Sequence, residues 1–248
     1  MAIDTDQLDD LLKRADRHQA RLISALATLE QRVVDLLAQA PLQDGNLFDL
    51  TWAVQARAPL RQAIDQEYLT VVNGIIGEYA EVADEVATML AEYGDIATLD
   101  PSVVSQLQEL TFSGFEDLGQ EYLDVISKQV YESTLTGTSF ADSVQQVQKA
   151  VGGDMARYAS QQVHDSLTQF DAAINAKIGL DSGATRWQYR GSKDGATRDH
   201  CEKHVNKTYT LDEMYEIWQG EWAGKSGSDP FINRGGFNCR HRWRPVFD

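Results

Sequence analysis

The sequence predicts a mainly α-helical protein, with a long-helix N-terminal region at residues 1–180 and a small α+β module at residues 181–248. Up to about residue 180, apolar residues recur at three- and four-residue spacing, which is the period of a helix face. Beyond it, short alternating segments, glycine-rich turns and aromatic residues take over. Both cysteines, three of the five histidines and four of the five tryptophans lie in the module, so we expect the functional chemistry there.

Charge separates the same two regions of this 248-residue chain, whose formal net charge is −16. Residues 1–185 hold 11 Lys and Arg against 29 Asp and Glu, whereas residues 186–248 hold 11 against 9. The acidic helices should therefore repel bare nucleic acid. The N-terminus lacks the apolar segment of a signal peptide, and no apolar run is long enough to predict a membrane span.

Five or six helices are expected before residue 180. Asp4 and Gln7 can cap the first helix, Pro41 ends it, and Asp100-Pro101 is a start signal for the third. Pro59 kinks or divides the second, because proline removes a hydrogen-bond donor. Gly152-Gly153 is expected to close the fourth. The expected ranges are 5–39, 49–93, 100–135, 139–151 and 154–178.

The module is expected to alternate short strands and short helices. Thr210 and Glu213 form a capping box at the start of one helix. The expected strands are 184–190, 207–210 and 238–246; the expected helices are 197–205 and 211–218, and residues 220–236 are irregular and glycine-rich.

Two Cys/His pairs form the sharpest motif of the module: Cys201 with His204, and Cys239 with His241. Two thiolates and two imidazoles make the ligand set that a structural zinc ion favours, and a small glycine-rich unit benefits from such a cross-link. A disulfide between Cys201 and Cys239 would serve the same purpose. Two free, buried thiols that pack as small apolar residues are the third alternative.

Two further sets of residues have functional interpretations. Asp199-His200, Asn233 and His241 follow the His–Asn–His order of ββα-metal nucleases, which use histidine as general base and as metal ligand. A metal-dependent nuclease or hydrolase that uses His200 and His241 is therefore an alternative function. Arginines can grip phosphate or an acidic protein surface, or can line a solvated strand face; those concerned are Arg234, Arg240, Arg242 and Arg244.

Three blocks carry a resemblance to a known family: T-R-D-x-C at 197–201, K-x-Y-T at 207–210 and N-R-G-G-F-N-C-R-H-x-W-x-P-V at 233–246. They resemble the C-terminal module of tailed-phage minor head proteins, the phage Mu F-like head-morphogenesis family. The resemblance covers about residues 135–248. Many members have cysteine where this chain has His204 and His241, an exchange that keeps a zinc site.

The resemblance implies a virion structural protein rather than an enzyme. We expect a few copies at the portal vertex, arranged around its symmetry axis, that act in head assembly or in genome packaging and delivery. The acidic helices would dock on the portal or the major capsid protein, and the last strand could contact packaged DNA. Such a protein would be in the host cytoplasm during assembly and afterwards in the virion head. A plain nucleic-acid-binding module is a further alternative.

Overall fold

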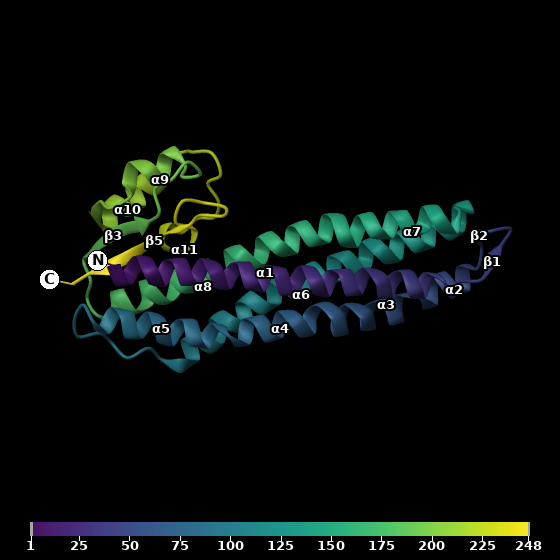
Figure 1. Ribbon diagram of the computed structural model, residues 1–248, viewed down its shortest axis with the longest axis horizontal. Coiled ribbons are helices and arrows are strands. Elements are labelled where there is room, and N and C mark those ends of the chain that lie inside the picture. Colours follow the sequence, from purple (N-terminus) through teal and green to yellow (C-terminus); the bar gives the residue numbers. More distant parts are fainter. Residues whose placement is uncertain (1, 248) are drawn as a thin grey trace. The chain divides into compact units, whose positions relative to one another are not determined.

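The computed structural model describes the chain from residue 2 to residue 247, with side chains described from residue 7 onward. The expected fold class is confirmed: long helices dominate, and a small three-stranded sheet lies in the C-terminal region (Figure 1). Among the described residues, no helix is both long and apolar enough to cross a membrane.

The chain divides into two compact units, and neither has a boundary at residue 180. Unit 1 contains the residues up to Arg17, Glu78–Gln108 and the chain from Val163 onward. Unit 2 contains His18–Gly77 and Glu109–Gln162. The C-terminal module therefore belongs to the same compact unit as residues from four of the helices that precede it.

The helical elements follow the expected order with more interruptions than expected. Their bounds are α1 Ala2–Leu37, α2 Leu50–Gln55, α3 Arg57–Ala63, the π-helical η1 Ile64–Leu69, α4 Thr70–Gly77, α5 Tyr79–Ala91, α6 Pro101–Thr136, α7 Phe140–Gln148, the π-helical η2 Lys149–Met155 and α8 Ala156–Asp181. Pro59 lies in the first turn of α3, where the missing N–H costs little. It therefore marks a helix start, with the junction at Ala56.

The expected helix end at Gly152-Gly153 is wrong. The π-helical segment η2 carries the chain through both glycines and into α8. Gly152 is needed for its small size, because a Cβ there would collide with the Glu30 carboxylate of α1 within unit 2. Glycine here permits a close helix approach and does not end the helix.

Unit 2 also contains a hairpin directly after Pro41, where only the end of the first helix was expected. Strand β1, Leu42–Gln43, pairs antiparallel with β2, Asn46–Leu47. Asp44 and Gly45 between them both have positive φ, 52° and 80°, as a type I′ turn requires. The hairpin lies against the α6–α7 junction, where the Phe140 N–H donates to the Gly45 carbonyl.

Unit 1 is built around a sheet with the strand order β4-β3-β5, all antiparallel. Three short helices accompany it, and the Thr210–Glu213 capping box of α10 is present as expected. The bounds are β3 Arg186–Gly191, α9 Asp199–His204, β4 Thr208–Thr210, α10 Leu211–Trp218, α11 Pro230–Asn233 and β5 His241–Val246. Helix α11 falls inside the segment expected to be irregular, and Asp229 caps it by accepting from the Phe231 and Ile232 amides.

Candidate metal centre

A buried cluster of Cys201, Cys239 and His241 lies in the core of unit 1. Helix α9 supplies Cys201, the first residue of β5 supplies His241, and the segment just before β5 supplies Cys239. All three side chains are at most 4% exposed. Their ligand atoms lie within 4.8 Å of one another, so the group can hold a metal ion. Of the two Cys/His pairs in the sequence, Cys201, Cys239 and His241 are thus brought together.

The distances suit a single ion. Cys201 Sγ lies 4.0 Å from Cys239 Sγ, and Cys239 Sγ lies 3.8 Å from His241 Nδ1. Around a tetrahedral zinc ion, with Zn–S of about 2.3 Å and Zn–N of about 2.0 Å, two sulfurs stand about 3.8 Å apart and a sulfur and a nitrogen about 3.5 Å apart. The three side chains thus fit zinc with small adjustments. The two thiols are not joined by a disulfide.

Glycines make room for this cluster. A Cβ on Gly235 would lie 2.5 Å from Cys201 Sγ and 2.9 Å from Cys239 Sγ, well inside van der Waals contact. Gly191 is paired with His241 across the β3–β5 ladder, and a Cβ there would collide with the imidazole ring. The backbone can therefore pack this closely against the donor atoms only because both positions lack a side chain.

The electrostatics of the pair favour one thiolate in the absence of metal. The hydrogen bond from Cys201 lowers the pKa of Cys239 well below its usual value, and His241 and Arg234 act in the same direction against the effect of burial. The same hydrogen bond, together with burial, raises the pKa of Cys201. The two sulfurs then share one proton, and a bound cation would take the place of that proton.

His204, the expected fourth ligand, lies outside the group that can share one ion. Its Nδ1 is 2.8 Å from the Tyr209 hydroxyl, and its ring lies 4.8 Å from that of His200. Burial lowers the pKa of His204. The expectation rested on Cys201 and His204 sharing one face of α9; the short helix instead aims His204 toward β4.

The histidines of the nuclease alternative are held in packing contacts. The His200 ring stacks on Trp222 at 3.7 Å, and burial lowers its pKa to about 4. His241 belongs to the cysteine cluster, and the Asn233 carboxamide oxygen accepts the Asp229 amide.

Burial takes Arg234 and Arg242 out of the expected solvated or phosphate-gripping strand face, whereas Arg240 and Arg244 are part-exposed and contact other residues of the protein. Arg234 and Arg242 are each 1% exposed, and Arg242 pairs with the buried Asp171 on α8. Arg240 forms a two-pronged hydrogen bond with Asp194 at 2.8 and 2.6 Å. Arg244 lies over the Tyr93 ring at 4.5 Å. Two guanidinium groups are thus core components, a role that a charge pattern along a strand does not reveal.

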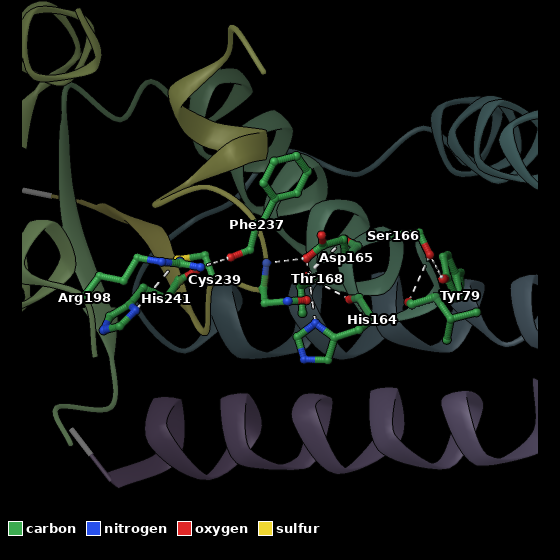
Figure 2. Close-up of polar contacts among 11 residues, drawn as sticks. Tyr79, His164, Asp165, Ser166, Thr168, Arg198, Phe237, Cys239 and His241 are labelled. Atoms are coloured by element: carbon green, nitrogen blue, oxygen red, sulfur yellow. Dashed lines mark hydrogen bonds and ion pairs between the residues drawn. The ribbon is translucent and has the colours of Figure 1, made fainter. Parts of the chain in front are cut away.

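Backbone contacts fix the segment that leads into Cys239. The Asn238 amide donates to Asp165 Oδ1 of α8 at 2.9 Å, and the Arg198 guanidinium donates to the Phe237 carbonyl. Figure 2 shows these contacts beside Cys239 and His241. Asn238 has a φ of 51°, in the left-handed region that asparagine tolerates better than most residues. These anchors set the direction in which Cys239 points.

Comparison of the chain with protein-family models, with curated proteins and with solved structures finds no match.

Proposed function

We propose that this chain is a virion structural protein of a tailed phage, a minor head protein of the Mu F-like class, present in a few copies at the portal vertex. The proposal rests on one observation. The three sequence blocks that carry the resemblance meet in one core. Block 197–201 supplies Cys201, block 207–210 contains strand β4, and block 233–246 supplies Cys239 and His241. These blocks lie apart in the sequence, yet all contribute to one core around β3.

The third block is also the one with the strictest structural demands. It contains the buried Arg234, the glycine that faces both sulfurs, and both β5-side donors of the cluster. These packing requirements explain why the block needs particular residues, and they involve no catalytic role. This supports a module that is specified for shape and recognition rather than for chemistry.

Within this module, the metal is zinc and its role is structural. Zinc prefers thiolate and imidazole ligands and has no redox chemistry of its own, so a buried ion of this kind links α9 to the start of β5. The linked segments are 38 residues apart. Joining them constrains most of the module in the unfolded state, which is where a cross-link gains its effect.

The helices supply the docking surface for the portal or the major capsid protein. Residues 78–108 carry seven Asp or Glu and no Lys or Arg. A surface of this charge is complementary to a basic protein surface and avoids the packaged genome.

Purified particles of the phage that encodes this chain test the proposal. Quantitative mass spectrometry should find the chain in DNA-filled heads at a small fraction of the copy number of the major capsid protein. A soluble non-structural protein of the same phage, which should be lost on purification, is the control. Absence of the chain from the particles would reject the assignment. Metal-dependent DNA cleavage by the purified chain, lost in His200→Ala, would support the nuclease alternative instead.

A further inference from the structure

Tyr189, in the central strand β3, places its hydroxyl against the metal cluster. Its side chain is fully buried, and its hydroxyl oxygen lies 3.4 Å from Cys201 Sγ and 3.4 Å from Cys239 Sγ. The Tyr189 ring stacks on the His241 ring, with centroids 5.2 Å apart and an interplanar angle of 7°. The phenol oxygen is thus a fourth donor atom that touches both sulfurs.

These two distances match two edges of a zinc-centred tetrahedron. Around a zinc ion with Zn–S of about 2.3 Å and Zn–O of about 2.0 Å, each sulfur–oxygen edge is about 3.5 Å long. The two observed edges from Tyr189 match this length more closely than the sulfur–sulfur and sulfur–nitrogen edges match theirs. A Cβ on Gly235 would lie 2.9 Å from the phenol oxygen as well as from Cys239 Sγ, so the oxygen and both sulfurs face the same backbone point.

The charge of a neighbouring side chain supports an anionic fourth ligand. Arg234 is 1% exposed and lines the same small pocket as Cys239 and His241. Its Nε and one terminal nitrogen, Nη1, have no hydrogen-bond partner among the described residues. Zinc with two thiolates and a neutral imidazole carries no net charge and would offer this buried guanidinium no counter-charge. A buried charge without a counter-charge is strongly unfavourable.

We propose that Tyr189 is the fourth zinc ligand and binds as a phenolate, so that the site is Cys201, Cys239, His241 and Tyr189. The zinc complex then carries one negative charge, and Arg234 balances it. On binding, the zinc–oxygen bond forms as the phenol O–H bond breaks, and that proton leaves to solvent with the protons that the thiols still hold. This inference rests on the proposed zinc site.

Zinc chloride titrated into the metal-free, reduced full-length protein tests the assignment. Ultraviolet difference spectra should show the tyrosinate band growing to one equivalent of zinc. Calorimetry in two buffers of different ionisation enthalpy should count the protons released.

Tyr189→Phe, which keeps the ring that stacks on His241, should lack the band, release one proton fewer and bind zinc about tenfold or more weakly. Tyr215→Phe, at a half-exposed tyrosine on α10, is the matched control and should behave as the wild type.

The outcomes separate the two claims. Zinc binding with no tyrosinate band, or with the same proton count in Tyr189→Phe and wild type, would overturn the assignment of Tyr189 and leave the three-ligand site standing. Failure of the wild type to bind zinc would overturn the metal site itself, and the assignment of Tyr189 with it.

Discussion

Arg242 of β5 and Asp171 of α8 form an ion pair in the core of unit 1, with Arg242 Nη1 3.1 Å from Asp171 Oδ1. The two residues are 1% and 2% exposed, and Gln7 of α1 accepts from the same guanidinium at 2.9 Å. In Figure 1, β5 runs beside the start of α1. The last strand is thus attached to α1 and α8, and this attachment sets where Cys239 and His241 lie.

Asp171→Ala should lower the free energy of unfolding by about 3–5 kcal/mol, because it leaves the Arg242 charge buried without its partner. Urea denaturation followed by circular dichroism measures this. Asp194→Ala, which breaks the exposed pair with Arg240, is the control and should cost far less, since water screens that pair. Equal losses in the two variants would show that burial of the Arg242–Asp171 pair does not matter.

Gly235→Ala should abolish tight metal binding. The added methyl group has no space beside the two sulfurs, and the overpacking should also destabilise the protein by about 1–3 kcal/mol. Gly195→Ala is the matched control, because a Cβ there meets no atom within 4 Å. Metal content after dialysis distinguishes them. Full metal occupancy in Gly235→Ala would mean that the two cysteine sulfurs do not meet beside residue 235.

His241→Gln should lose the metal, whereas His204→Gln should retain it. The reason is geometric: His241 Nδ1 faces Cys239 Sγ, while His204 Nδ1 faces the Tyr209 hydroxyl. Competition with a chromophoric zinc chelator measures both affinities. The opposite ranking of the two variants would restore His204 as a ligand and displace His241.

Cys239→Ala should loosen unit 1 and leave unit 2 folded. Hydrogen exchange should quicken in β3, β5 and α9, which meet at the cluster, because the cross-link between them is lost. Residues 18–77 and 109–162 form the other compact unit and should keep their protection. Wild-type protection throughout unit 1 would mean that the cysteines serve only as packing residues.

Much of the fold follows from local patterns, because capping and turn chemistry act within a few residues. Thr210 with Glu213 predicted α10, and the alternation of polar and apolar residues over 238–246 predicted β5. Local signals were less informative at Gly152-Gly153, where the packing of Glu30 from a distant helix decides the outcome. Helix α11 was also missed, although Asp229-Pro230 carries a local start signal.

The candidate site was predictable only in its cysteines and in His241. Residue type reveals a thiol or imidazole as a ligand, but Tyr189 reads as an ordinary core aromatic and Arg234 as a surface charge. Their part in the site depends on where β3 and the segment before Cys239 lie in space, which no spacing rule encodes. His204 has the right residue type, yet the hydrogen bond to Tyr209 holds it elsewhere. The positions of glycines in the N-R-G-G-F run were the available signal for close packing, since glycine is required where backbone approaches another group.

Metal content of the full-length protein, purified without added zinc or chelator, tests the central claim that one ion holds the module together. Atomic spectroscopy should find about one zinc per chain in the wild type and none in Cys239→Ala, as expected for a four-ligand structural site. No zinc in the wild type, with both thiols reacting once the protein is unfolded, would contradict the account. So would an intact mass lower by two hydrogens, which would identify a disulfide in place of the metal.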